Sequence, residues 1–349
     1  MKARDILLSL SFLTFLSANA YDFSATLNGQ KLYFDITSRS KNTACVTFNG
    51  TPTAIKAPDL KGTVEIPAKI KHNDVVYTVT EIGPKAFADA KKLEGVIIPS
   101  GIEKIGDFAF EGCETLKMIV FPGNPVTLGQ GTFFRCPDIS SVTIGSDWKS
   151  IDFTMFRWSN QLTTITVPAK IEKIQGFKKL KNLKSITVDG NNMSFSSVDG
   201  ILYSKDGKKL YGCPRGYMGN VKVKDGTESV ETGALIDCLH ITGIDLPATM
   251  KKISFRETSR MKALKTIIVR SEEPLITGYI QKQGKFLFEL TDQKTEIVVP
   301  SASKNKYIDI LAIEGGEYSI SPDGTPYSVE KQELPLKKNI KGVKNFEKY

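Results

Sequence analysis

The chain has few of the residues from which most catalytic and metal sites are built. Of its 349 residues, two are histidine and five are cysteine. Neither His72 nor His240 has a metal-ligand spacing around it, and the sequence contains no His-Glu-x-x-His, Gly-x-Ser-x-Gly or Cys-x-x-Cys motif. We therefore expect no cofactor, no metal site and no catalytic residue, and we expect that the protein is not an enzyme.

The chain also lacks an apolar run long enough to cross a membrane. Lys2 and Arg4 precede an apolar stretch at 6–16, and Ala-Asn-Ala at 18–20 suits signal cleavage. The stretch is shorter than the ~20 residues of a membrane span. Residues 1–20 are therefore predicted to be a Sec-type signal peptide. No cysteine follows it for a lipid anchor, so we expect a secreted, periplasmic or cell-surface protein without a membrane span.

Neither sign of charge is strongly in excess. Lys and Arg number 47 and Asp and Glu 38, which gives a net charge of +9, and 40% of the residues are hydrophobic. This is the balance of an ordinary folded protein. Pairs of lysines are scattered over expected turns with few aromatic residues between them, so no nucleic-acid partner is expected.

What the sequence does contain is an internal repeat. The pattern L-x-x-L-x-L recurs, and the residue after its third apolar position returns every 23 residues at Pro99, Pro122, Gly145 and Pro168. The apolar sets are Leu93/Val96/Ile98, Leu116/Ile119/Phe121, Ile139/Val142/Ile144, Leu162/Ile165/Val167, Leu183/Ile186/Val188, Ile241/Ile244/Leu246 and Leu264/Ile267/Val269. A period of this length is typical of solenoid proteins.

Each repeat has a second half with its own fixed positions. Eleven residues after the proline position stand Phe110, Phe133 and Phe156, with Leu235 in a later repeat. These rings are expected to stack between neighbouring repeats. Fourteen residues after the proline position stand Cys113, Cys136 and Cys238, which we expect to be free buried thiols, although a bridge between Cys113 and Cys136 stays geometrically possible.

The physical interpretation is a solenoid of the α/β class. Each L-x-x-L-x-L segment is predicted to be a short strand. The proline that follows it ends the strand, because proline has no N–H to donate to a neighbouring strand. We expect 23-residue coils with one parallel strand ladder on the concave face, and short helices or irregular segments on the convex face.

The repeat unit resembles a known family. I-x-I-P followed by I-x-x-I-G-x-x-A-F-x-x-C-x-x-L is similar to the BspA-like leucine-rich repeat (LRR_5 type) of secreted bacterial cell-surface proteins, over about residues 63–307. Residues 199–210, which begin with Asp-Gly-Ile-Leu-Tyr, are similar to a hairpin insertion of such proteins, and residues 298–307 are similar to their terminal element. Two repeats depart from the pattern: 163–183 is two residues short, and 242–264 has Thr258 where phenylalanine is expected.

The chain is accordingly divided into four parts. A signal peptide at 1–20 precedes an N-terminal β cap at 21–62, in which Asn28-Gly29 is a strong hairpin signal. The repeats occupy 63–307, with the hairpin insertion at about 190–214, and a C-terminal cap and tail occupy 308–349. The tail is expected to be weakly ordered or to extend the cap as a strand.

The outward positions of the strands are the candidate binding residues, because core packing does not dictate their identity. They are Glu94, Gly95, Ile97; Lys117, Met118, Val120; Ser140, Ser141, Thr143; Thr163, Thr164, Thr166; Lys184, Ser185, Thr187; Thr242, Gly243, Asp245; and Lys265, Thr266, Ile268. The predicted partner-binding residues are Ile97, Lys117, Met118, Val120, Thr143, Thr164, Thr166 and Thr187. Threonine is also a good strand former, so an unselected β surface remains the alternative.

Two functions fit these features. The first is a non-enzymatic, adhesion-like interaction protein that binds an extracellular protein or glycan through the solenoid face, as the family resemblance implies. The alternative is a secreted glycan-processing enzyme or a glycan-binding accessory protein. A glycosidase needs two carboxylates close together, whereas the outward acidic residues Glu94 and Asp245 lie at opposite ends of the array.

Overall fold

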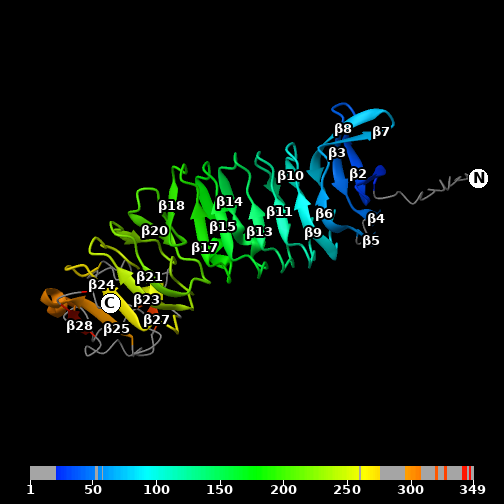
Figure 1. Cartoon of the computed structure of the whole chain (residues 1–349). Helices are drawn as coiled ribbons and strands as arrows, with labels where there is room; N and C mark the ends of the chain where they lie inside the picture. Colours follow the sequence, from blue (N-terminus) through cyan, green and yellow to red (C-terminus); the bar gives the residue numbers. More distant parts are fainter. Residues whose placement is uncertain are drawn as a thin grey trace, which may run out of the picture.

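The computed structural model describes residues 21–51, 54–56, 58–258, 261–275 and 295–307, together with 319–320, 326–327, 340–343 and Phe346. The predicted signal peptide and most of the predicted tail lie outside the described residues. Figure 1 shows an elongated molecule in which the chain advances from one end to the other, strand beside strand. The fold has many parallel strands and few helices.

The L-x-x-L-x-L segments form parallel strands. Residue pairs such as Gly95↔Met118 and Met118↔Ser141 reproduce the 23-residue step of the sequence, and Thr164↔Ser185 reproduces the short repeat. The strands are β6 (Lys61–Glu65), β9 (Lys92–Ile97), β11 (Met118–Val120), β13 (Ser141–Thr143), β15 (Thr164–Val167), β17 (Ser185–Val188), β21 (Gly219–Lys222), β23 (Ile241–Leu246), β24 (Thr266–Val269), β25 (Glu296–Pro300) and β28 (Ile340–Val343).

The expectation of one continuous ladder is wrong, because the ladder is interrupted twice. Its three parts run β6-β9-β11-β13, β15-β17 and β21-β23-β24-β25-β28. At the first gap, Gly145 stands in the proline position and is pressed so closely on the preceding repeat that a Cβ would lie 1.7 Å from the carbonyl oxygen of Pro122. The Trp148 indole also donates to the carbonyls of Pro122 (3.2 Å) and Asn124 (2.8 Å). These contacts hold residues 145–148 against the preceding repeat.

The second gap is made by the insertion. Strands β18 (Phe195–Val198), β19 (Ile201–Ser204) and β20 (Lys209–Gly212) form an antiparallel meander. Its first turn has positive φ at Asp199 (52°) and Gly200 (78°), as a tight hairpin requires. The Gly200 carbonyl accepts a hydrogen bond from the Ile186 amide at 2.9 Å, so the hairpin takes the place beside β17 that the next strand would fill.

A second parallel ladder, which the sequence analysis did not foresee, is formed by the other half of the repeats. Its strands are β8 (Val75–Ile82), β10 (Lys104–Ile105) and β12 (Thr127–Leu128), then β14 (Ser150–Asp152) with β16 (Lys173–Gln175), and β20 with β22 (Ser229–Val230). Short 3-10 turns η1 (Phe153–Phe156), η2 (Phe177–Lys179), η3 (Phe255–Thr258) and η4 (Ser301–Ser303) make up the helical content alongside a brief turn at 304–307. None of the helices in the described part is long and apolar enough to span a bilayer.

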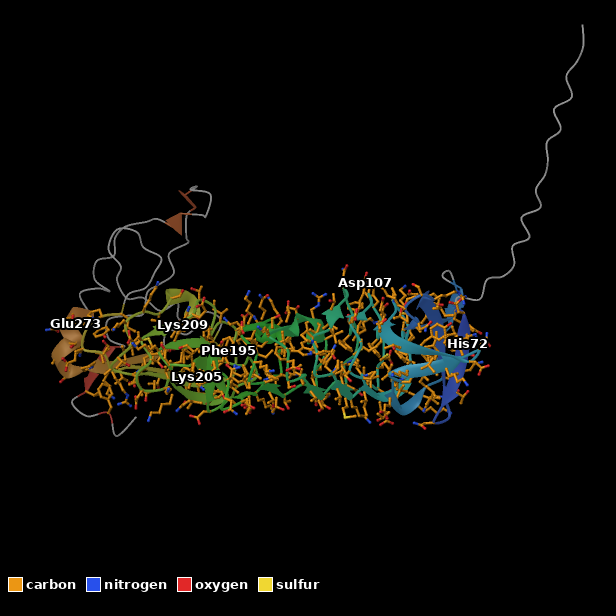
Figure 2. The ribbon with its side chains drawn as sticks, turned by 90° about the horizontal axis from the view of Figure 1, so that it is seen from above. His72, Asp107, Phe195, Lys205, Lys209 and Glu273 are labelled. Atoms are coloured by element: carbon orange, nitrogen blue, oxygen red, sulfur yellow. The ribbon has the colours of Figure 1, made fainter. Side chains whose placement is uncertain are left out.

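The core runs between the two ladders and contains the expected ring stack. The centroids of Phe87 and Phe110 are 4.9 Å apart, those of Phe110 and Phe133 5.3 Å, and those of Phe133 and Phe156 5.1 Å, with all four rings buried. The stacking predicted from the 23-residue period is thus confirmed. Figure 2 shows side chains filling the rod between His72 near one end and Glu273 near the other.

The N-terminal end carries additional strands. β1 (Phe23–Leu27) and β2 (Gln30–Ser38) form an antiparallel hairpin through Asn28 and Gly29, whose φ angles are 46° and 74°. β3 (Thr43–Thr47) pairs antiparallel with β2 and parallel with β8. β7 (Lys69–His72) pairs antiparallel with β8. The short strands β4 (Asn49–Thr51) and β5 (Ala54–Lys56) pair with each other.

At the C-terminal end, the segment that resembles the family's terminal element is anchored by Tyr307. This ring is buried, and its hydroxyl donates to the backbone carbonyls of Ser271 (2.8 Å) and Glu273 (3.0 Å). Beyond it, β26 (Ser319–Ile320) pairs with β27 (Pro326–Tyr327), and β28 joins β25 in parallel. Of the two possibilities for the tail, residues 340–343 therefore adopt the strand.

Candidate functional site

The outward side chains of β6, β9, β11, β13, β15 and β17 form one surface, which we call the strand face. Strand register arranges them in two rows. The first row is Thr63, Gly95, Met118, Ser141, Thr164 and Ser185, and the second is Glu65, Ile97, Val120, Thr143, Thr166 and Thr187. Every predicted partner-binding residue except Lys117 lies in these rows. Six strands at ~4.8 Å spacing give the face a length of about 25 Å.

The half of the strand face nearest the N-terminus contains an apolar patch beside the polar Thr63 and Glu65. A Cβ on Gly95 would lie 3.2 Å from the Met118 methyl group and 2.7 Å from the Thr63 hydroxyl, so glycine allows Met118 to lie across β9 toward β6. Ile97 and Val120 are directly opposed in the ladder, and both are half-buried. Together these residues form a compact apolar patch on an exposed sheet surface.

The other half is rich in hydroxyl groups and is hollowed. A depression of about 350 Å³ lies at the gap between β13 and β15, and its polar lining includes Ser141, Thr143, Thr164 and Thr166. Within residues 58–258, all of which are described, no strand pairing joins β13 to β15. The depression therefore combines side-chain hydroxyls with the edges of two strands.

Three of the charged residues at the outward positions, Glu94, Lys117 and Asp245, are paired within the protein. Lys117, which lies just before β11, donates to Glu94 at 3.1 Å. Asp245 accepts two hydrogen bonds from Arg270, at 2.7 and 2.8 Å. Glu94 and Asp245 thus each face a cation.

One residue at an outward position is buried. Ile268 of β24 is only 6% exposed, and its ladder neighbour Val298 is fully buried. The C-terminal residues return to this end of the molecule, where the Phe346 ring lies 4.8 Å from the Arg270 guanidinium. The outward side of β24 and β25 is therefore not part of an open face.

The cysteines are packed into the interior as thiols. All five are described, buried and free of disulfides, which confirms the predicted burial of Cys113, Cys136 and Cys238. The thiols of Cys113 and Cys136 donate to the carbonyls of Phe87 (3.1 Å) and Phe110 (3.0 Å). Burial raises the pKa of Cys45 to about 12 and that of Cys213 well above its usual range, so these groups stay protonated.

No group of three metal-ligating side chains comes together in the part of the chain that the structure describes. His240 is exposed, and His72 stacks on the Phe23 ring at 4.2 Å.

A comparison with protein families matches the BspA type leucine-rich repeat region, in six copies over residues 80–198 and 211–312. The match covers more than half of the chain. The chain belongs to the BspA-type leucine-rich repeat family. The interval between the two matched stretches, 199–210, falls within the β18–β20 meander that interrupts the BspA-type repeats.

Solved structures of other leucine-rich repeat proteins are similar to this BspA-type chain. A leucine rich cell surface protein from Faecalibacterium prausnitzii is 19% identical, with 80% of this chain and 89% of that one covered and a TM-score of 0.39. The pneumococcal vaccine antigen PcpA is 18% identical, with coverages of 83% and 96% and a TM-score of 0.43. A leucine-rich repeat protein from Bacteroides ovatus is 18% identical, with coverages of 81% and 79% and a TM-score of 0.42. A search of curated proteins found no match.

Sequence reasoning missed Thr63 and Glu65, which extend both rows onto β6. Their segment, Val64-x-Ile66-Pro67, has the strand pattern of Val96-x-Ile98-Pro99 but precedes it by 32 residues instead of 23. Strand β7 and the long strand β8 lie between this segment and β9 and lengthen the interval. A search for the strand pattern without a fixed 23-residue period would have found the segment that contains Thr63 and Glu65.

Proposed function

We propose that the protein is a non-enzymatic, adhesion-like interaction protein, secreted, periplasmic or exposed on the cell surface, and that it binds an extracellular protein or glycan through the strand face. We further propose that the repeats form a solenoid of 23-residue coils capped by residues 21–62. Membership of the BspA-type family supports the repeat architecture, while the function is argued from the face itself, because fold alone does not fix function.

The observation that carries the proposal is the composition of the two outward rows. The fold requires the inward residues of each strand, but it leaves the outward ones open. Even so, Met118, Val120 and Ile97 gather into an apolar patch, and Thr143, Thr164 and Thr166 border the depression. A contiguous apolar patch on a polar surface is a common mark of an interaction site. Hydroxyl groups beside it can donate to and accept from a polar partner.

The alternative, a glycan-processing enzyme, has no such support. The outward carboxylates Glu94 and Asp245 are each paired with a cation. A glycan-binding accessory role remains within the proposal, since it uses the same hydroxyl-rich surface without a catalytic pair.

The test is a binding screen with matched variants. The mature chain is applied to a glycan array and to surfaces coated with collagen, fibronectin and laminin. The double variant Val120→Lys with Thr166→Lys places a charge in each half of the strand face and is expected to lose at least tenfold in affinity for whatever the wild type binds.

The control is Thr127→Lys, which adds the same charge at an exposed position of β12 in the second ladder. It should bind as the wild type does. The proposal is wrong if the double variant binds as well as the control while its unfolding midpoint is unchanged.

A further inference from the structure

The strand face ends at an edge strand, β6, whose backbone has one open side. β6 is the last strand of the sheet β13-β11-β9-β6. The Ile66 amide donates to the Ile97 carbonyl of β9 at 3.0 Å. In a parallel strand the N–H and C=O groups of alternate residues point to the same side, so those of Val64 also face β9. The backbone groups of Thr63 and Glu65 consequently point away from β9, toward the β1–β2 hairpin.

The β1–β2 hairpin already places one amide group against the open edge of β6. The Gln30 side-chain amide donates to the Lys61 carbonyl at 2.7 Å, and the Lys61 amide donates to the Gln30 side-chain oxygen at 3.2 Å. One primary amide therefore makes with Lys61 the two hydrogen bonds that a neighbouring strand would make. Thr63 and Glu65 continue the same edge, and among the described residues no such amide is seated on them.

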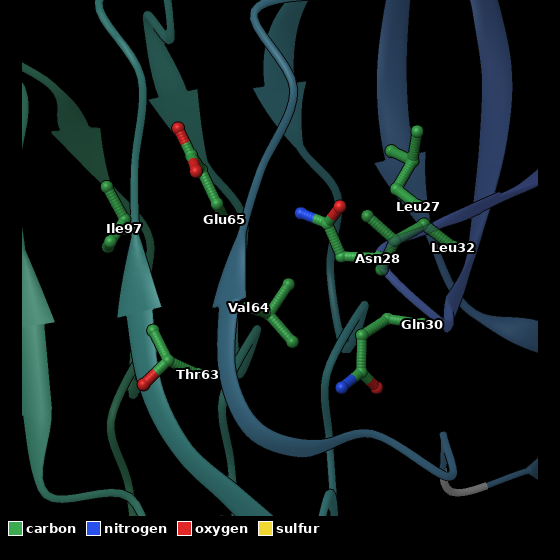
Figure 3. Close-up of a pocket in the computed structure, with 8 residues that line it drawn as sticks. All are labelled: Leu27, Asn28, Gln30, Leu32, Thr63, Val64, Glu65 and Ile97. Atoms are coloured by element: carbon green, nitrogen blue, oxygen red, sulfur yellow. The ribbon is translucent and has the colours of Figure 1, made fainter.

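A hollow of about 140 Å³ lies beside these two residues (Figure 3). Its apolar wall is formed by Leu27 and Leu32 of the hairpin, Val64 of β6 and Ile97 of β9. An apolar cavity of ~150 Å³ can hold a molecule the size of benzene. The hollow is thus large enough for one apolar side chain, and Ile97 makes it continuous with the apolar patch of the strand face.

We propose that an extended polypeptide segment of a partner adds to β6 as a further strand, pairs with the backbone of Thr63 and Glu65, and places one apolar side chain in the hollow. This deepens the proposed function, on which it rests, by naming the partner class at this end of the strand face. A polypeptide offers amide N–H and C=O groups at the two-residue spacing of Thr63 and Glu65, whereas a glycan offers hydroxyls with no such repeat.

The experiment uses linear seven-residue peptides displayed on phage and selected against the mature full chain, with the winning peptide then synthesised. Glu65→Pro removes the edge-facing amide and leaves the pairing to β9 intact, because proline is tolerated where the N–H faces away from the sheet. We expect this variant to lose at least tenfold in affinity for the peptide. Glu65→Gln keeps the amide, removes the charge and should bind as the wild type does.

A second readout guards against a folding defect. In the wild type, hydrogen exchange at the Thr63 and Glu65 amides should slow when the peptide is added, while exchange in β17 should not change. The proposal is overturned if no peptide is selected, if Glu65→Pro binds the peptide normally, or if neither amide gains protection.

The result is separable from that of the strand-face test. Thr166 lies on β15, four strands from β6 in the row order, so Thr166→Lys should leave peptide binding at β6 intact. Loss of peptide binding in Glu65→Pro together with no binding on the glycan and matrix panel would support the edge site and reject the wider face. If Glu65→Pro binds the peptide normally and the wild type binds a partner on the glycan and matrix panel, the edge site is rejected and the wider strand face is not.

Discussion

Truncation of Phe110 is the sharpest test of the repeat architecture. Its ring is fully buried and lies between two others, with centroids 4.9 Å from Phe87 and 5.3 Å from Phe133. Replacing a buried phenylalanine by alanine costs about 3–5 kcal/mol through lost burial and the cavity left behind. Each aromatic contact contributes a further ~0.5–1.5 kcal/mol beyond burial. Because two contacts are lost, we expect Phe110→Ala to fall in the upper half of the 3–5 kcal/mol range.

The measurement is urea unfolding of the mature chain, followed by circular dichroism and by tryptophan fluorescence so that cooperative loss can be recognised. The control is Trp158→Ala, which removes a large ring that is 46% exposed and should cost less than about 1.5 kcal/mol. If Phe110→Ala cost less than about 1 kcal/mol, or no more than the control, the continuous ring stack would not stabilise the fold as argued.

Three further predictions concern polar groups. Asn192→Ala should lower the free energy of unfolding in urea by more than about 2 kcal/mol. The buried Asn192 side chain donates to two backbone carbonyls and accepts from two backbone amides, and all four groups would lose their partner. An unchanged free energy of unfolding would contradict this. Asp245→Asn should lower the free energy of unfolding by about 1–2 kcal/mol, and by less in high salt, because it breaks the partly exposed ion pair that Asp245 makes with Arg270 through two hydrogen bonds. If the variant is as stable as the wild type at low salt, the ion pair does not stabilise the fold. Burial raises the pKa of Glu257 in the folded state, against the opposing hydrogen bonds from the Leu235 and Gly233 amides. The folded state therefore binds the Glu257 proton more tightly than the unfolded state, so the protonated group stabilises the fold below about pH 4, and this stabilisation is lost as pH rises through the folded pKa. Glu257→Gln should abolish this loss of stability with rising pH. An unchanged dependence of unfolding free energy on pH in the variant would contradict the assignment.

The repeated core could be predicted from the sequence because its residues recur at a fixed step. Phe110 and Phe133 are 23 residues apart, and a ring in one repeat meets its counterpart in the next. Burial of Cys113 and Cys136 followed from the same argument. In each case the pattern spans several repeats, so chance agreement is small.

The second ladder could not be predicted in the same way. β10 and β12 contain two residues each, too few for an alternating pattern to distinguish a strand from a turn. The break in the first ladder had a signal, Gly145 in the proline position, but its meaning depends on the close approach to Pro122, which only the folded structure shows.

The errors at the two ends of the array have a common cause. Ile268 fits the outward pattern of its strand, but its surroundings are set by residues far away in the chain, as the Arg270–Phe346 contact shows. Likewise, Thr63 and Glu65 join the strand face through a repeat that β7 and β8 lengthen. Local periodicity predicts which side of a strand a residue takes, but not what covers that side.

The most direct test of the strand face as the binding surface is methionine oxidation in the presence of a partner. Met118 lies in the face, whereas Met193 (81% exposed) and Met218 (67% exposed) lie outside it and serve as internal controls. The mature chain is treated with dilute peroxide, with and without a saturating amount of the matrix protein or glycan that the screen identifies, and sulfoxide is measured at each methionine by mass spectrometry. We expect the partner to slow oxidation of Met118 and to leave Met193 and Met218 unchanged. Unchanged oxidation of Met118, with protection at Met193 or Met218, would place the binding surface elsewhere.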